Sequence, residues 1–120
     1  MEKEKTKSLL SEEQVARLVK DYPLYSQEDK GADAVALYHF TGVMEWYILE
    51  GSREGEGVTL FGLTVGSYTE MGYLSLNELN GIVETYGSEA VSLDTSFEAK
   101  SLRDIPDEGV KEYLRRMKFI

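Results

Sequence analysis

The sequence predicts an α+β domain, in which an antiparallel sheet of about four strands carries three helices in the order αβββαβα. Two serine capping signals, at Ser11 and Ser75, each precede apolar residues at helical spacing. Between them lie three short segments rich in valine, leucine and aromatic residues. A chain of 120 residues with 42% hydrophobic content fits one core. We therefore expect a single domain over 1–120, with 1–8 as a frayed tail and with the helices gathered on one side of the sheet.

The first helix is predicted to begin at Ser11. The serine side chain accepts a hydrogen bond from the free amide of Gln14, and Gln14 reaches back to the serine amide. Leu10 and Val15 have the spacing of a hydrophobic staple across this turn. Because proline cannot continue a helix, we expect the helix to end just before Pro23.

Three segments after this helix have the composition of strands and are separated by glycine-containing turns of hairpin length. They are 34–40, 45–50 and 58–65. The polar segment 26–33 in front of them predicts a loop. Residues 46–49 are apolar on both alternating faces, so we expect the middle strand to be covered on both sides.

Ser75, followed by Glu78 three residues later, repeats the capping pattern and predicts a second helix that ends at Gly87. The residues at 70–74 are interpreted as the approach to this helix, with glycines that allow turns.

The remainder of the chain predicts one more strand and one more helix. Alternating apolar residues indicate a strand over 90–97, and the segment Asp104-Ile105-Pro106 suits the start of a helix. The only basic patch lies in this last helix, where cations complement the helix dipole. Its members are Lys111, Arg115, Arg116 and Lys118.

The middle of the chain is strongly acidic. Between Gly31 and Ala99 there are eleven acids and one base, Arg53, which gives a balance of −10. Proteins that bind nucleic acid gain much of their affinity by neutralising phosphates with lysine and arginine. We therefore expect no direct contact with nucleic acid, and a basic protein as the partner.

Several other kinds of chemistry are excluded by composition. The absence of cysteine removes disulfides, thiolate nucleophiles and cysteine-based metal sites. No segment approaches the roughly 18 consecutive apolar residues that cross a bilayer, and the first residues alternate in charge. We therefore expect a cytoplasmic protein with no membrane contact and no cofactor.

His39 is the only histidine, so any acid–base mechanism that uses histidine must depend on it. A lone histidine within a predicted strand is typical of an ordinary polar or half-buried residue, and we predict no catalytic residue. Carboxylates are the only abundant reactive groups. As an alternative, Glu45, Glu50 and Glu70 could supply oxygen ligands to a divalent ion such as Mg²⁺.

Acidic and aromatic residues occur together just before the second helix. Tyrosine offers a rigid contact area with a polar tip, and glutamate complements a basic partner. We predict a partner-binding surface on the sheet and second helix, with its carboxylates on one continuous outward face. The candidate residues are Glu45, Glu50, Glu54, Glu56, Tyr68, Glu70, Tyr73 and Glu78.

Three stretches, Trp-Tyr-Ile-Leu-Glu at 46–50, Phe-Gly at 61–62 and Glu-Met-Gly-Tyr-Leu-Ser-Leu-Asn-Glu-Leu at 70–79, together with Gly66, resemble a family. It is a family of small bacterial, plasmid and phage proteins catalogued as the domain of unknown function twenty-nine fifty-eight. The likeness extends over about 35–79, with a looser match through 93–102.

The resemblance implies a setting among accessory genes of mobile elements, near DNA-processing and defence-related functions; some members carry a single-strand nuclease label. The chain departs from the family pattern at Tyr38-His39-Phe40-Thr41-Gly42, which lacks the lysine and proline often found there. The segment 67–80 is also similar to acidic antirestriction proteins, which imitate the charge of DNA.

Three hypotheses follow. The first is a non-enzymatic binding protein of a mobile element, an anti-defence inhibitor that imitates nucleic-acid charge toward a basic, nucleic-acid-handling protein. The second is a carboxylate–metal nuclease or hydrolase. The third is a structural domain that dimerises through an uncovered face of its sheet; composition does not choose an oligomeric state.

Overall fold

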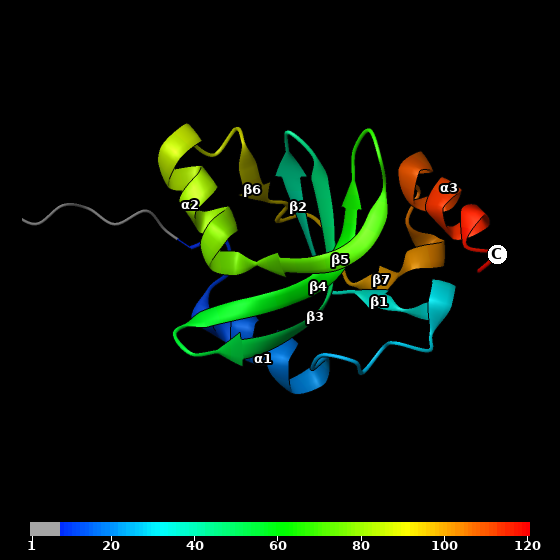
Figure 1. Cartoon of the computed structure of the whole chain (residues 1–120), viewed down its shortest axis with the longest axis horizontal. Helices are drawn as coiled ribbons and strands as arrows, with labels where there is room; N and C mark the ends of the chain where they lie inside the picture. Colours follow the sequence, from blue (N-terminus) through cyan, green and yellow to red (C-terminus); the bar gives the residue numbers. More distant parts are fainter. Residues whose placement is uncertain (1–7) are drawn as a thin grey trace, which may run out of the picture.

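Five antiparallel strands form the central sheet, in the order β5-β4-β3-β2-β6 (Figure 1). A computed structural model describes residues 8–120, so the predicted tail lies, apart from Ser8, outside the described residues. In chain order the elements are α1 (Glu12–Asp21), a 3₁₀ turn η1 (Gly31–Asp33), β1 (Val35–Ala36), β2 (Tyr38–Gly42), β3 (Glu45–Glu54), β4 (Gly57–Val65), β5 (Glu70–Ser75), α2 (Leu76–Tyr86), β6 (Val91–Leu93), β7 (Lys100–Ser101), a second 3₁₀ turn η2 (Leu102–Asp104) and α3 (Glu108–Arg116).

The prediction of an α+β domain with three helices and an antiparallel sheet is confirmed, but the main sheet has five strands instead of about four. The additional strand is β5, which the sequence analysis interpreted as an approach to α2. It pairs with β4 in a register that places Tyr73 opposite Phe61 and Gly72 opposite Gly62. Strands β4 and β5 form a hairpin across the short connection 66–69, whereas the capping signal at Ser75 marks only the boundary where the strand ends and α2 begins.

Two of the predicted strands are divided or shortened in the structure. The predicted strand 34–40 is divided at Leu37, since β1 leaves the main sheet and pairs with β7 as a small two-stranded sheet. The predicted strand 90–97 keeps only the three residues of β6. It ends because the side chain of Asp94 accepts hydrogen bonds from Ser96, which makes a turn.

All three helices begin at a capping side chain. Ser11 has both halves of the predicted capping box, and Ser75 accepts from the amide of Glu78 at 3.2 Å. The third helix begins later than predicted, because Asp107 and not the segment 104–106 supplies the cap, through a 2.8 Å bond from the amide of Gly109.

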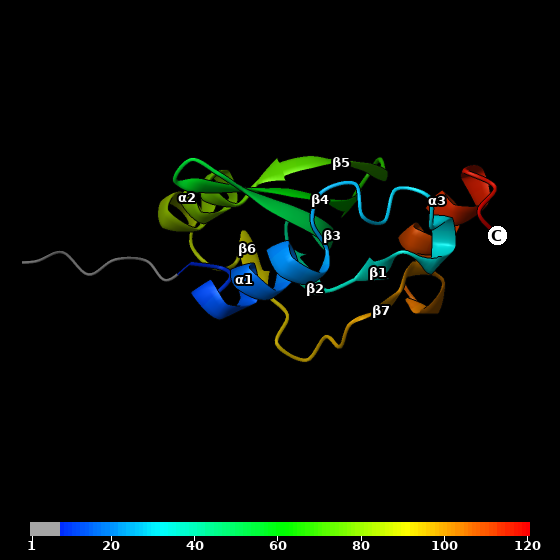
Figure 2. The ribbon, with the colours of Figure 1, turned by 90° about the horizontal axis from the view of Figure 1, so that it is seen from below.

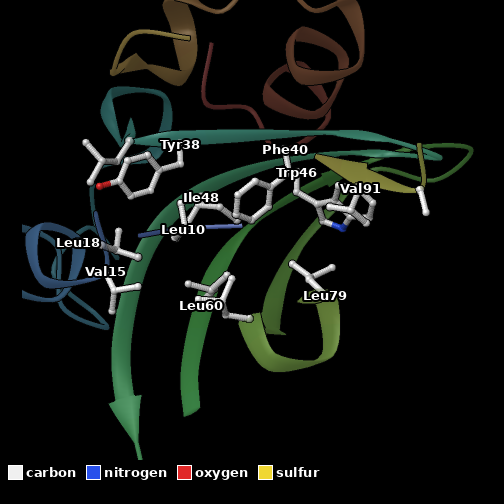
Figure 3. Packing of buried hydrophobic residues seen from close by; sticks show 13 residues of the cluster. Leu10, Val15, Leu18, Tyr38, Phe40, Trp46, Ile48, Leu60, Leu79 and Val91 are labelled. Atoms are coloured by element: carbon white, nitrogen blue, oxygen red, sulfur yellow. The ribbon is translucent and has the colours of Figure 1, made fainter. Parts of the chain in front are cut away.

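One face of the sheet is covered by α1 and α2, which enclose the first cluster of buried apolar residues (Figure 3). The residues of this cluster are Leu10, Val15, Leu18, Leu37, Tyr38, Phe40, Trp46, Ile48, Leu60, Leu76, Leu79, Ala90 and Val91. Burying a single leucine or phenylalanine stabilises the fold by about 1.5–3 kcal/mol.

The opposite face carries a second cluster, built with α3, η1, η2 and the β1–β7 pair. Its residues are Ala32, Ala34, Ala36, Tyr47, Leu49, Leu63, Leu102, Ile105, Val110, Tyr113 and Leu114. The helices are therefore not gathered on one side; α1 and α2 lie toward one end of the molecule and α3 toward the other (Figure 2). The prediction that β3 is covered on both faces is confirmed, because Trp46 and Ile48 face one cluster while Tyr47 and Leu49 face the other.

Candidate functional site

The eight predicted partner-binding residues lie in different parts of the molecule. Glu54 and Glu56 are exposed at the β3–β4 hairpin, next to α2 and its exposed Glu78. Tyr68 and Glu70 lie beyond the far end of β4 (Figure 1). Since β4 has nine residues, it separates this pair from Glu54, Glu56 and Glu78 by about 25 Å. Tyr73 is exposed in the middle of β5, and the remaining two glutamates are described below. The eight residues therefore do not form one continuous face.

The group at the far end is close to the cations of α3. The guanidinium of Arg116 lies 5.2 Å from the ring centre of Tyr68 and donates a hydrogen bond to the carbonyl of Thr69. A cation over an aromatic face is held by the ring quadrupole. Arg116 thus brings positive charge to the residues next to Glu70 in the chain, which disfavours this end as the predicted acidic surface.

Acidic side chains do gather at the other end, around a groove of about 510 Å³ between the start of α1, the β3–β4 hairpin and α2. We call this the acidic groove and define it by its acids Glu12, Glu56 and Glu84. Arg53 also lines it, but its guanidinium is paired with Glu12. In the sequence, no lysine or arginine occurs between Arg53 and Lys100, so β4 and α2 bring no positive charge to this end.

Glu50 is buried, with 3% of its surface exposed, and cannot be part of an outer acidic face. A β-bulge between Ile48 and Glu50 shifts the register of β3, so that Glu50 lies opposite Phe61 on the side of the second cluster. One carboxylate oxygen of Glu50 accepts a hydrogen bond from the backbone amide of Tyr25, and the other accepts one from the backbone amide of Gln27; both N···O distances are 2.8 Å. The loop after α1 is therefore anchored to the sheet by this glutamate.

Glu45 belongs to a network around His39, which lies in β2 and is 7% exposed. The two imidazole nitrogens each lie 2.9 Å from a carboxylate: Nδ1 from Asp94 and Nε2 from Glu45. The imidazole stacks on the ring of Tyr47 at 4.2 Å, with an angle of 7° between the planes. The hydroxyl of Tyr47 donates to Asp107, the cap of α3, at 3.0 Å. The network thus joins β2, β3, the residue after β6 and the start of α3.

The carboxyl groups of this network have different pKa values. Burial, with the neighbouring carboxyl of Asp107, raises the pKa of Glu45 above its ordinary value. Burial alone would raise the pKa of Asp107 as well, but hydrogen bonds from Glu45, the Gly109 amide and Tyr47 outweigh it and lower that pKa. Hydrogen bonds from Ser96 and then from His39 lower the pKa of Asp94. Burial, followed by Asp107, raises the pKa of Tyr47.

This geometry suits a structural role better than a catalytic one. A general base needs one imidazole nitrogen within reach of a substrate or nucleophile. Both nitrogens of His39 are instead bonded to carboxylates, and the ring faces are covered by Tyr47 and, at 5.4 Å, by Phe97.

The three carboxylates of the alternative metal site are not brought together. Glu45 bonds to His39, and both oxygens of Glu50 accept backbone amides. Across residues 8–120, no group of three or more histidines and carboxylates has the arrangement that would hold a metal ion.

Sequence reasoning missed Asp94, Asp107 and Gln27, which hold these sites in place. The Asp-x-Ser pattern at Asp94 and the Asp-x-Gly pattern at Asp107 are local turn and cap signals, and they could have located both aspartates. Nothing local connects either of them to His39 or Tyr47, which lie more than fifty residues away in the chain.

Comparison with known proteins gave no match, whether with family models, with curated proteins or with solved structures. Within the part of the chain that the structure describes, none of the helices has the length and apolar character needed to span a bilayer.

Proposed function

We propose that this chain is an acidic, non-enzymatic binding protein whose acidic groove engages a basic, nucleic-acid-handling protein. The single observation that supports the proposal is an excess of negative charge around one groove: its one arginine, Arg53, is paired with Glu12, and no ion pair found among residues 8–120 includes Glu56 or Glu84. A hollow lined by one sign of charge concentrates the electrostatic field and attracts groups of the opposite sign.

The resemblance to mobile-element proteins and to acidic antirestriction proteins agrees with this partner. An accessory protein of a mobile element that imitates the charge of DNA would occupy the basic surface with which a nuclease or other defence protein contacts phosphates. The separation of Glu70 and Tyr68 from the groove narrows the proposed surface to the end formed by α1, the hairpin and α2.

The test is an affinity capture from the native host at low and at high salt, followed by titration of the captured protein. The double variant Glu56→Gln, Glu84→Gln removes two groove charges and keeps their shape. Since an exposed charge pair contributes about 0.2–1 kcal/mol, we expect the double variant to bind roughly tenfold more weakly. We also expect wild-type affinity to fall as salt is raised, because screening is effective beyond about 8 Å at physiological ionic strength.

A matched control carries the same loss of charge elsewhere. Glu98 and Glu112 are exposed and lie outside the groove, so Glu98→Gln, Glu112→Gln should bind like the wild type at every salt concentration. A complex whose affinity does not change with salt, or one that the control weakens as much as the groove variant, contradicts the proposal.

A further inference from the structure

A smaller pocket, of about 280 Å³, opens between the loop after α1, strands β3 to β5 and the end of α3. Five aromatic rings line it, together with two carboxylates, Glu28 and Glu50; the rings belong to Tyr25, Phe61, Tyr73, Tyr113 and Phe119. No lysine or arginine is among the described residues that line this pocket. We call it the aromatic pocket.

Glu50 gives the aromatic pocket a buried negative charge. Each of its oxygens accepts a single backbone amide, whereas an ionised carboxylate offers about four acceptor positions. No ion pair found among residues 8–120 includes Glu50. A buried carboxylate is costly unless a charge or further donors compensate it, so the site favours a positively charged guest.

The rings of the aromatic pocket are arranged as walls. Phe61 and Tyr73 are opposite each other across β4 and β5, with ring centres 5.0 Å apart and an angle of 59° between the planes. The neighbouring hydroxyl of Tyr25 raises the pKa of Tyr73, and the charges of Glu50 and Glu28 act in the same direction. Negative ring faces and negative carboxylates therefore converge on one small space.

The backbone of Tyr25 is held in a conformation that residues other than glycine rarely adopt. Its φ is 75°, in the left-handed region, and the 2.8 Å bond from its amide to Glu50 fixes it there. Strain of this kind concentrates at sites where a particular orientation is useful. Here it leaves 64% of Tyr25 exposed at the pocket mouth.

Phe119 is placed by the way α3 ends. The amide of Lys118 donates to Arg115 and the amide of Phe119 donates to Leu114, which is the hydrogen-bond pattern of a Schellman motif. Lys118 takes the left-handed position, with φ 61°. The motif turns the ring of Phe119 back beside Tyr113, with ring centres 6.5 Å apart, and so closes one side of the pocket.

From these observations we propose that the aromatic pocket binds an organic cation, namely a substituted ammonium group such as trimethylammonium. The rings of Tyr25, Phe61, Tyr73 and Phe119 supply the faces that such a cation prefers, while Arg116 already lies 5.3 Å from the ring centre of Tyr113. Glu50 and Glu28 supply the opposite charge. An anion would be repelled, and a bare metal ion would find too few oxygen ligands. The volume is at or below the ~300 Å³ lower limit of ordinary ligand sites, which suits a head group and not a nucleotide.

A second hollow of the molecule shows the contrast. It is larger, about 730 Å³, and lies between α1, α2 and β6. It is lined by Glu13 and Arg17, whose charges balance, and by four serines and a single aromatic residue, Tyr38. The aromatic pocket differs in gathering five rings and two carboxylates with no lysine or arginine in its lining.

The test is an NMR titration of the ¹⁵N-labelled full chain with tetramethylammonium and with choline. The neutral isostere of choline, 3,3-dimethylbutan-1-ol, has the same shape without the charge and serves as the ligand control. We expect saturable shifts of the amides of Tyr25, Gln27 and Tyr73 with both cations, and at least tenfold weaker binding of the neutral alcohol. Absence of saturable shifts, or equal binding of the alcohol, overturns the proposal.

Variants locate the site. Tyr73→Leu removes one wall and should weaken choline binding about fivefold, in line with the usual strength of a cation–π contact. Tyr86→Leu is the matched control, since Tyr86 is 75% exposed and lies outside the pocket, and it should leave binding unchanged. Tyr25→Gly removes a second wall and relieves the strained φ, so it should fold and yet bind more weakly. Equal binding by the wild type and both pocket variants also overturns the proposal.

The same titration separates two sources of the ammonium group. A short peptide with trimethyllysine should bind more tightly than choline if the natural guest is a methylated side chain of a protein, and no more tightly if the guest is a free amine. The aromatic pocket does not depend on the acidic groove. Glu56→Gln, Glu84→Gln should therefore leave choline binding intact, so that failure of one proposal is distinguishable from failure of the other.

Discussion

Glu45 is a partly exposed carboxylate of the network around His39, and its titration should be visible in the stability of the protein. Its pKa is raised in the folded state by burial and by Asp107. Between the ordinary pKa, about 4.3, and the raised value, the folded state keeps a proton that the unfolded chain has released. The contribution of Glu45 to the free energy of unfolding therefore decreases as the pH rises through this window.

Glu45→Gln has no such proton to lose. We expect the stability of the variant, relative to that of the wild type, to increase from about pH 4 to about pH 7 in urea unfolding curves. The pKa values of Asp94 and Asp107 are lowered in the folded state. The pH range in which these two aspartates change stability therefore lies below the ordinary pKa of aspartate, outside the range over which the two proteins are compared. If the difference in the free energy of unfolding between the two proteins stayed constant over this pH range, the raised pKa of Glu45 would be contradicted.

Residues that act through distant partners could not be predicted from the sequence. Gln27, in a polar segment interpreted as a loop, is 4% exposed. Its side-chain amide donates to the carbonyls of Val35 and Leu49, and its oxygen accepts the amide of Val35. The segment is a loop as predicted, but its polar composition gave no sign that one side chain substitutes for backbone pairing.

At the scale of single elements, the end of α3 offers a direct test of backbone strain. Lys118 has a positive φ, at a position where glycine carries no steric penalty. We expect Lys118→Gly to raise the free energy of unfolding by about 0.5–1 kcal/mol. The measurement is chemical unfolding followed by circular dichroism.

The neighbouring residue is the matched control. Met117 has φ −82°, so Met117→Gly relieves no strain; it adds flexibility to the unfolded chain, removes a half-buried side chain and should lower stability by at least a similar amount. A loss of stability in both variants would show that the left-handed position carries no strain.

Local capping signals located two of the three helix starts, whereas strand β5, which depends on its pairing with β4, was not predicted. The starts of α1 and α2 follow from a serine and a residue three positions later, and both were located correctly. Strand β5 pairs with β4 so that Gly72 lies opposite Gly62; an added Cβ on Gly62 would come within 2.2 Å of the Tyr47 carbonyl in β3, whereas one on Gly72 would meet no atom within 4 Å. The close approach of β3 and β4 involves residues outside 70–75, so this short segment could not reveal the pairing.

At the scale of the whole molecule, the two apolar clusters share β3, and we expect them to unfold together. Val110→Ala removes two methyl groups from the second cluster and should cost about 2 kcal/mol. Trp46, the only tryptophan, lies in the first cluster on the opposite face. Its fluorescence should report the same shift of the unfolding midpoint as far-UV circular dichroism.

Val43→Ala provides the control, because Val43 is 75% exposed and its loss should leave both midpoints unchanged. If Trp46 kept its wild-type midpoint in Val110→Ala, the two faces would be independent units and not one cooperative structure.

The bulge in β3 also has a bearing on how related chains should be compared. Before the bulge, even-numbered residues such as Ile48 face the helices α1 and α2. After the bulge, the odd-numbered Gly51 faces them, since a Cβ added to Gly51 would lie 2.5 Å from Leu18. A homologue shorter by one amino acid at this point could lose the bulge and still keep its equivalent of Glu50 opposite Phe61, on the same face of the sheet. In an alignment, a gap beside Leu49 would therefore signal a relative with a regular strand here, and would not by itself mean that the buried acid is missing.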